Sequence, residues 1–477
     1  MKVIVLEARD RPGGRAYAAL MPGTDINVDL GASWIHGPDN NPVTEVATLY
    51  GGVHVPVPMP FEKTSFSTAF CSSVKEGFMF SNQEMQRYAM LFEEMVEEIE
   101  SAHYSSTTSL YDAVCAQILT YESASETQLH AEGVTRGDVT AMKALAPIFL
   151  ECLEIMVGGN AAELRAGGGY EEGGGHGVSG TDHMVTSQVG TLVLSLLKGL
   201  TTERERFELV LNSAVQRIEN INTRICIRCA SGVDYLVEKT IITIPLGVLK
   251  QRHQDLFQPN LPNWKVQAIE AIGYGHVSKL YLLFDALFWR RGVEEEANSQ
   301  AQWYFFPVST IDGQGSHTEF CIFLDLFTVL GQPLLLGFAG GKNASTLEKR
   351  SDLDVVQGAV HTIEIGLGMS RLQERLLSHS LSRWGEDPYC LGAYSFLGRN
   401  AQREDRTSLR LPVVMGPGEE YNVYFAGEHT SSHWAATLHG AIDSGVEAAQ
   451  SVLASYGINS ARKGKLKGGM KDGCMCS

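Results

Sequence analysis

The chain opens on an expected β-strand that ends in an acidic residue, and this start limits the fold more than any other feature. Residues 2–6 read Lys-Val-Ile-Val-Leu, Glu7 follows, and turn formers including Gly13 and Gly14 come next. In a doubly wound α/β fold, an acid at a strand tip binds the ribose of an adenine dinucleotide, and an arginine such as Arg15 suits a phosphate. A solvated acid at an ordinary turn is the alternative. The G-x-G-x-x-G motif expected about 20 residues earlier has no place, because six residues precede Glu7.

Strand and helix signals alternate at both ends of the chain. Short runs rich in β-branched residues predict strands at 208–211, 215–219, 224–228, 240–245 and 422–426. Helical spacing of apolar residues predicts a surface helix over 84–100, and a second helix is expected over 437–455. This order indicates an α/β nucleotide-binding domain assembled from separated segments, with a second domain inserted.

Composition and charge exclude several classes of protein. The net charge is −17, whereas nucleic-acid binding requires a basic face. Nine cysteines in 477 residues are too few for a disulfide scaffold. The most apolar stretch, residues 320–340, is interrupted by polar residues and predicts two buried strands around the turn at 331–333 rather than a membrane span. Cys226 and Cys229 have metal-ligand spacing but no second pair, so no metal site is expected.

Five segments in the same order along the chain resemble signatures of the flavin-containing amine oxidases, and within that family the chain is most similar to the polyamine oxidases. The resemblance extends from residue 2 to about residue 455. The segments are residues 6–15, 29–37, 244–250, 257–265 with 272–279, and 424–430 with 437–445.

The resemblance implies an α/β fold with two domains. A discontinuous Rossmann-like domain that binds FAD would comprise residues 1–42, 176–252 and 412–457. A substrate-binding domain with a mixed sheet and helices would comprise residues 43–175 and 253–411. The family's first strand and glycine-rich loop have no counterpart in the sequence, so we expect a truncated gene model whose true start lies upstream of Met1.

The resemblance also implies non-covalent FAD, because residues 432–437 lack the cysteine to which monoamine oxidases attach their flavin. Glu7 would hold the ribose, Arg9 and Arg15 the phosphate region, and the backbone of Val215 the adenine. The cofactor-binding residues expected in full are Glu7, Arg9, Gly14, Arg15, Gly31, Ala32, Ser33, Trp34, Val215, Trp384, Gly427, Glu428, Thr437 and Leu438.

The implied reaction is oxidation of polyamines (spermine, spermidine or acetylated forms) by hydride transfer to flavin N5, with imine hydrolysis and reduction of O2 to H2O2. Lys279 would hold a water against N5, and His36 would contact a polyamine nitrogen; both are catalytic candidates. Substrate would also meet Glu154, Trp384, Tyr394 and Thr437. Alternatives are a flavin oxidase of another amine or of a protein lysine, and an FAD-free, non-catalytic homologue that binds polyamines or a protein partner.

The last residues, 458–477, form an expected disordered basic tail. Cys474-Met-Cys-Ser477 fits the C-a-a-X pattern, and five basic residues precede it, so Cys474 is a candidate for prenylation. A plain disordered tail is the alternative. We expect a cytoplasmic monomer without nucleic-acid partners, whose only route to a membrane is a prenylated Cys474.

Overall fold

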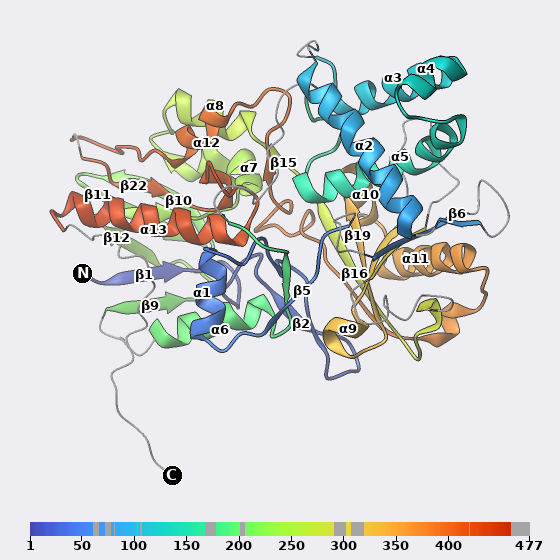
Figure 1. The fold of residues 1–477 in the computed structure, drawn as a ribbon. Helices are drawn as coiled ribbons and strands as arrows, with labels where there is room; N and C mark the ends of the chain where they lie inside the picture. Colours follow the sequence, from blue (N-terminus) through green and yellow to red (C-terminus); the bar gives the residue numbers. More distant parts are fainter. Residues whose placement is uncertain are drawn as a thin grey trace.

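The computed structural model describes residues 1–60, 66–71, 78–80, 82–102, 104, 107–166, 178–200, 206–290, 302–306, 319–418 and 420–458. The predicted basic tail, with Cys474, therefore lies outside the described residues apart from residue 458, and so does the expected domain boundary at 175/176. Figure 1 shows two halves side by side. One contains β1, α1 and α13, and the other contains the sheet of β16 and β19 with α2 to α5 over one end.

The half that contains the N-terminus is built from short parallel pairs and one small sheet. β1 (Val3–Leu6) pairs in parallel with β9 (Phe207–Val210), and β13 (Thr240–Ile242) pairs in parallel with β22 (Val423–Phe425). Along the described chain, β9 is the one strand paired with β1. The small sheet has the order β12 (Asp234–Val237), β11 (Arg224–Cys229), β10 (Val215–Ile221) and β14 (Phe257–Gln258). The strands predicted from β-branched runs are thus confirmed, except that the one expected over 240–245 ends at Ile242.

The other half contains a seven-stranded sheet. Every residue of its central strands β16 and β19 is buried, which explains their almost continuous apolar sequence. The predicted strand pair around residues 331–333 is confirmed as β18 and β19, with the short α9 (Phe327–Leu330) before the turn. The order is β20 (Leu376–Leu381), β16 (Val277–Phe284), β19 (Leu334–Gly340), β18 (Ile322–Asp325), β17 (Gln302–Phe305), β6 (Phe66–Cys71) and β7 (Phe78–Phe80).

The structure also has three smaller strand groups among the described residues: β2 (Ala18–Leu20) with β3 (Asn27–Asp29), β15 (Gly273–Tyr274) with β21 (Ser395–Phe396), and β8 (His183–Val185) between β4 (Trp34–Ile35) and β5 (His54–Pro56). Besides α9, the α-helices of the described residues are α1 (Pro42–Leu49), α2 (Asn82–Ser101), α3 (Leu110–Ser123), α4 (Glu126–Ala131), α5 (Arg136–Val157), α6 (Val189–Leu200), α7 (Leu246–Leu256), α8 (Asn263–Ala271), α10 (Gly341–Leu347), α11 (Asp352–Leu367), α12 (Arg403–Arg410) and α13 (Leu438–Ser455).

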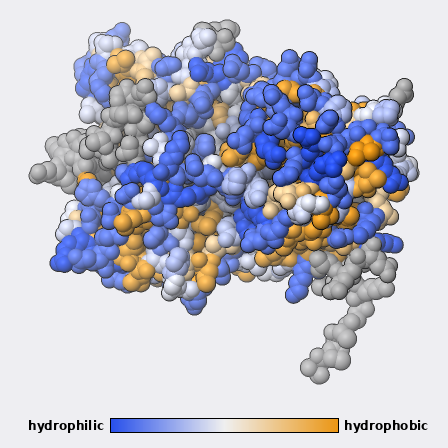
Figure 2. All heavy atoms as spheres, turned by 180° about the vertical axis from the view of Figure 1, so that it is seen from behind, coloured by the Kyte–Doolittle hydropathy of each residue, from blue (hydrophilic) through white to orange (hydrophobic). Residues whose placement is uncertain are grey.

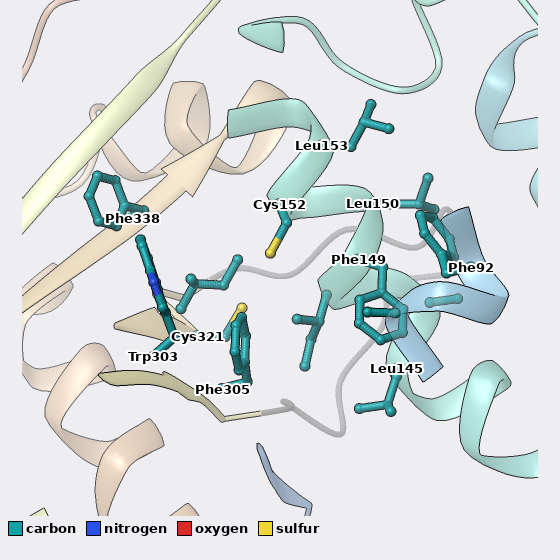
Figure 3. Close-up of a cluster of buried hydrophobic side chains, with 14 of the residues drawn as sticks. Phe92, Leu145, Phe149, Leu150, Cys152, Leu153, Trp303, Phe305, Cys321 and Phe338 are labelled. Carbon is teal, nitrogen blue, oxygen red and sulfur yellow. The ribbon is translucent and has the colours of Figure 1, made fainter. Parts of the chain in front are cut away.

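Helix α5 links the helical layer to the seven-stranded sheet. It begins with a capping box between Thr135 and Asp138 and ends at Gly158, whose φ of 85° is left-handed. On one side Phe149 packs on Phe92 of α2, with ring centroids 5.1 Å apart. Further along, Cys152 lies near Cys321, near Trp303 and Phe305 of β17, and near Phe338 of β19, as Figure 3 shows. The predicted helix over 84–100 is confirmed as α2, and its five apolar positions are buried.

Two further hydrophobic clusters group segments that are distant in sequence. One joins the small sheet to α7, α8 and residues 397–425, and the other joins α1 to β4, β8 and α6. Residues 43–47, 256–272 and 397–409 therefore pack with the half that contains β1, although the expected boundaries assign them to the substrate domain. The division into domains stays a prediction.

The face seen in Figure 2 is mostly hydrophilic, with apolar side chains in several separate groups. No helix in the described part of the chain is both long and apolar enough to cross a membrane.

Candidate active site

A cavity of about 870 Å³ lies between the two halves of the molecule. Its wall comes from β1 and the following turn, residues 30–36, α5, residues 213–215, β16, β17, β19, residues 384–394 and the start of α13. Its size is at the upper end of the range of small-molecule and cofactor sites. All fourteen residues expected to bind the cofactor line this cavity, as do Lys279, His36 and Tyr394.

In the wall of the cavity, the acid predicted from the first strand lies beside Arg9. The Glu7 carboxylate accepts a hydrogen bond from the Arg9 backbone N–H at 2.9 Å. The Arg9 guanidinium donates to Asp387 at 2.6 Å and lies over the ring of Tyr389, 5.2 Å from its centroid. Arg9 is thus fixed by residues almost 380 positions away in sequence, which places a cation at the wall of the cavity.

Arg15 and Glu428 form the most buried ion pair of the wall. The Nη1 of Arg15 donates to Glu428 Oε1 at 3.2 Å and to the carbonyl of Ala393. The other Glu428 oxygen accepts from Ser395 Oγ at 2.6 Å and from the Ala436 N–H at 3.0 Å. Burial opposes ionisation of Glu428, but the charge of Arg15 and these hydrogen bonds hold its pKa below the usual range.

The segment from Gly31 to Trp34 runs along the cavity against Arg15 and Lys279. Residue 31 must be a glycine, because the backbone of Arg15 lies so close that a Cβ at residue 31 would be 1.7 Å from the Arg15 carbonyl oxygen. The Lys279 ammonium donates to Gly31 O and to Ser33 Oγ, both at 2.5 Å, and to Asp29 O at 3.4 Å. An ammonium group has three N–H donors, and these three bonds use all of them. A water held by Lys279 would therefore replace the longest bond, the one to Asp29 O.

Lys279 and Asp29 are both buried, and their titrations depend on each other. Burial lowers the pKa of Lys279, and the charge of Asp29 opposes that shift. Burial also raises the pKa of Asp29, while the backbone N–H of Val189 and the charge of Lys279 oppose it. Because Asp29 accepts a hydrogen bond from the Val189 N–H, it also caps the start of α6. Its negative charge partly offsets the positive charge of Lys279.

The cavity also contains an aromatic chamber, which is formed by Trp34, Trp303, Phe338, Trp384 and Tyr394. The rings of Trp34 and Trp303 lie 5.8 and 5.7 Å from that of Phe338. Trp384 donates from its indole N–H to Leu30 O at 2.9 Å, and the Tyr394 hydroxyl donates to the carbonyl of Ile155. These two hydrogen bonds fix the rings, so their faces are available to an aliphatic ligand.

Two predicted substrate residues, His36 and Thr437, also line the cavity. His36 faces the carboxylate of Asp182, with Nδ1 and Oδ2 2.7 Å apart. Thr437 caps α13, because its hydroxyl oxygen accepts from the Gly440 N–H at 3.0 Å and donates to Trp434 O. The Thr437 hydroxyl is thus occupied within the helix cap.

The structure places Glu154 away from the cavity, and the prediction that it binds a substrate ammonium has no geometric support. Cys152, Ile155 and Met156 of the same helix line the cavity, but Glu154 does not. Its carboxylate accepts from the Ala161 N–H at 2.7 Å and lies against Gly341 at the end of β19. Burial, opposed by that hydrogen bond, raises its pKa to about 8, so the side chain is largely neutral at pH 7.

Sequence reasoning missed several lining residues, of which Asp182, Trp303, Phe338, Ile155 and Tyr389 are the most informative. Trp303 and Phe338 lie in strands with no motif around them, so only the sheet order brings them to the cavity. Tyr389 follows the predicted Trp384 by five residues, and its proximity to Trp384 was the available signal. Across the described chain, no group of three or more His, Cys, Asp or Glu side chains is arranged to hold a metal ion.

A parallel strand tipped with an acid, beside an aromatic chamber, is typical of proteins that bind a nucleotide cofactor and a small organic ligand in one cavity. Comparison with known families agrees with this class: residues 1–453 match the model of the flavin-containing amine oxidoreductases. The chain therefore belongs to the flavin-containing amine oxidoreductase family, whose members are FAD-dependent amine oxidases.

Two curated polyamine oxidases are similar to this chain over most of their length. The chain is 27% identical to Polyamine oxidase 3 of Oryza sativa subsp. japonica over 94% of this chain and 84% of that protein. It is 27% identical to Polyamine oxidase 2 of Arabidopsis thaliana over 96% and 85%. It is also 25% identical to Lysine-specific histone demethylase 1 homolog 2 of Oryza sativa subsp. japonica, over 95% of this chain and 54% of that protein.

Among solved structures, wild-type putrescine oxidase bound to putrescine superposes with a TM-score of 0.63 at 16% identity, over 94% of this chain and 93% of that one. This likeness shows the mixed α/β fold, as predicted.

Proposed function

We propose that the chain is an FAD-dependent polyamine oxidase that binds its flavin without a covalent bond. The observation that carries the proposal is that a single cavity collects the predicted cofactor residues and the predicted substrate residues, with Glu154 as the exception. These residues come from segments as far apart as Glu7 and Leu438. The polyamine oxidases among the curated relatives support polyamines as the substrate class.

The chemistry of the wall fits FAD. Glu7 would accept hydrogen bonds from ribose hydroxyls, and the guanidinium groups of Arg9 and Arg15, which line the same cavity, would supply cations to a diphosphate. A Cβ built on Gly14 meets no atom within 4 Å, so the backbone there is open to a ligand. The start of α13 at Thr437 and Leu438 presents helix N-terminal N–H groups, which favour a partially negative ring edge.

When bound, the flavin would accept a hydride from the carbon beside the amine nitrogen and deliver electrons to O2, giving H2O2 and an imine that water hydrolyses. The protein's part is to bind and orient. Trp34, Phe338 and Tyr394 enclose the alkyl chain and exclude water from it. Lys279 places a positive charge at the inner wall, where it would stabilise charge that develops during oxygen reduction.

The aromatic chamber favours a flexible aliphatic amine over a bulky or anionic ligand. Aromatic faces attract an ammonium group and pack on methylene groups. The acidic net charge of the protein, −17, favours approach of a polycation such as spermine or spermidine. O2 would be the second small-molecule reactant, and we propose a monomer in the cytoplasm.

The tail adds a separate proposal about location. A prenyl group on Cys474, with Arg462, Lys463 and three further lysines before it, would give the two signals that stable membrane anchoring needs. We expect the wild-type chain, made in eukaryotic cells, to partition partly with membranes, whereas Cys474→Ser stays in the supernatant. Equal partitioning of both proteins would contradict prenylation.

The first experiment is an absorbance spectrum of the purified chain, followed by peroxide assays with spermine, spermidine, their acetylated forms, putrescine and a methyl-lysine peptide. We expect flavin bands, release of FAD on acid denaturation, and peroxide with a polyamine. Lys279→Met should reduce peroxide formation per bound flavin by on the order of 10²-fold, while the exposed Lys143→Met, a matched loss of charge, should not. Activity confined to the peptide would refute the polyamine assignment, and absence of FAD would indicate a non-catalytic homologue.

A further inference from the structure

The pairing of two short strands brings a histidine and a carboxylate together at the cavity. β4 pairs antiparallel with β8, with Ile35 opposite His183, so His36 and Asp182 are the next residues beyond that pair. His36 Nδ1 lies 2.7 Å from Asp182 Oδ2, and Asp182 Oδ1 accepts from the Gly37 N–H at 2.9 Å. Asn41 donates to the His36 carbonyl at 2.8 Å and holds its backbone. Both oxygens of Asp182 therefore have fixed partners.

This arrangement defines which nitrogen of His36 has the proton. An ionised carboxylate only accepts hydrogen bonds, so the neutral imidazole must donate from Nδ1. Its Nε2 is then left with a lone pair. Since His36 and Asp182 both line the cavity, and the His36 side chain is one-third exposed, that lone pair is accessible to a ligand.

We propose that Asp182 is a positioning residue that fixes His36 with Nε2 as the acceptor, so that His36 removes the proton from the ammonium group of the bound amine. The proposal rests on the proposed function and extends it to the step before oxidation. One N–H bond of the substrate ammonium breaks, one N–H bond forms at Nε2, and the electron pair of the broken bond stays on the amine nitrogen. Asp182 stabilises the resulting imidazolium, which returns its proton to solvent.

The other titratable groups around His36 do not compete for this proton. His439 of α13 has its ring centroid 6.4 Å from that of His36, and its Nε2 has no hydrogen-bond partner among the described residues. Burial and then the charge of His36 lower the pKa of His439 to about 4, so it stays neutral. On the other side of Asp182, burial and the charge of His54 lower the pKa of His183, and the charges of Asp182 and Asp39 oppose this shift. His36 is thus the basic group directed at the ligand.

Asp182→Asn tests the orientation, because the Gly37 N–H dictates how the new amide must lie. That N–H needs an acceptor, so the amide oxygen stays on Gly37 and the NH2 group faces His36 Nδ1. Nδ1 must then accept, and the proton moves to Nε2, where it cannot take another from the substrate. Asp39→Asn is the matched control, because it removes the same charge nearby at an exposed carboxylate bonded to Ser179.

The first measurement is independent of turnover. The ¹⁵N chemical shifts of His36 in the purified chain, assigned by their loss in His36→Asn, should show a protonated Nδ1 and an unprotonated Nε2. Asp182→Asn should reverse the two, and Asp39→Asn should leave them unchanged. A protonated Nε2 in the neutral imidazole of the unsubstituted chain would overturn the proposal, whatever the activity of the protein.

The second measurement is the rate of anaerobic flavin reduction by spermine as a function of pH. Asp182→Asn should lower the second-order rate constant of flavin reduction on the order of 10² to 10⁴-fold. It should also move the acidic limb of the profile to higher pH, where the amine loses its proton without a base. In a His36→Asn background it should have no further effect. A fall in rate with an unchanged pH profile, or one equal to that of Asp39→Asn, would mean that the pair only joins β4 to β8. Failure of the unsubstituted chain to bind FAD or oxidise any amine would instead refute the proposed function.

Discussion

The buried pair of Arg15 and Glu428 provides the sharpest energetic test of the site, because it is measurable without cofactor or substrate. Only about 5% of the Glu428 side chain is exposed, against 22% for Arg15. Arg15→Met leaves the Glu428 carboxylate buried without its cation, and a stranded buried charge typically costs about 3–5 kcal/mol. Ser395 and Ala436 still donate to Glu428, so we expect the lower end, about 3 kcal/mol.

The converse change is milder. Glu428→Gln removes the charge but leaves Arg15 bonded to the Ala393 carbonyl and partly exposed, so we expect a loss of about 1–2 kcal/mol. If the larger cost of Arg15→Met comes from the stranded carboxylate, that cost should fall to about 1 kcal/mol when residue 428 is already Gln. The interaction energy of the pair should therefore be about 2 kcal/mol.

The assay is urea unfolding of the cofactor-free protein, followed by tryptophan fluorescence and circular dichroism, for the four members of the double-mutant cycle. Burial opposes the charged form of Glu428, yet Arg15 and its hydrogen bonds keep its pKa below the ordinary 4.5. A lowered pKa gives stability that is present above pH 4.5 and is lost as pH falls through the lower folded value. The interaction energy should thus be constant from pH 6 to 8 and decline only below about 4.5.

An exposed ion pair serves as the reference. Arg371 and Glu374 are 76% and 62% exposed, and their interaction energy should be below about 1 kcal/mol. An interaction energy for Arg15 and Glu428 within about 0.5 kcal/mol of zero would refute the reasoning, because it would show that solvent or rearrangement replaces the pair.

Three further changes have defined outcomes. Gly31→Ala places a Cβ 1.7 Å from the Arg15 carbonyl, so the soluble yield and the FAD-to-protein ratio should both fall sharply. Lys265→Met removes the fully buried ammonium that donates to three carbonyls at the end of α12, and should lower the unfolding free energy by about 2–4 kcal/mol in urea titrations. Burial and the charge of His54, whose Nδ1 lies 2.6 Å from His183 Nδ1, lower the pKa of His183. Protonation of His183 in acid therefore favours the unfolded chain, and His54→Gln should weaken the loss of thermal stability below pH 6.5.

Local pattern was sufficient for much of the fold. The five apolar positions of α2 repeat at helical spacing, and the structure buries all of them. β1 and β22 are short apolar runs bounded by turn residues, and each forms a parallel pair as expected in an α/β arrangement. Such signals are contained in neighbouring residues, so they do not depend on the rest of the chain.

Contacts between distant segments could not be predicted in the same way. Asp182 meets His36 because β8 pairs with β4 across almost 150 residues, and no motif marks that register. Trp303 and Phe338 reach the cavity through the order of strands in the seven-stranded sheet. The resemblance identified residues that lie in or next to recognisable segments. The places of Asp182, Trp303 and Phe338 in the cavity depend on the strand topology alone.

Glu154 shows why a residue's type and approximate place do not define its chemistry. One helical step separates Glu154 from Ile155, but Ile155 lines the cavity and Glu154 lies against Gly341. A position on α5 differs from its neighbour by about 100°, so an error of one residue moves a side chain from the cavity into the helix–sheet interface. There burial raises its pKa to about 8, so without a cation beside it the acid is largely neutral at pH 7. The sequence identifies a carboxyl group, but the packing around that group determines whether it is ionised.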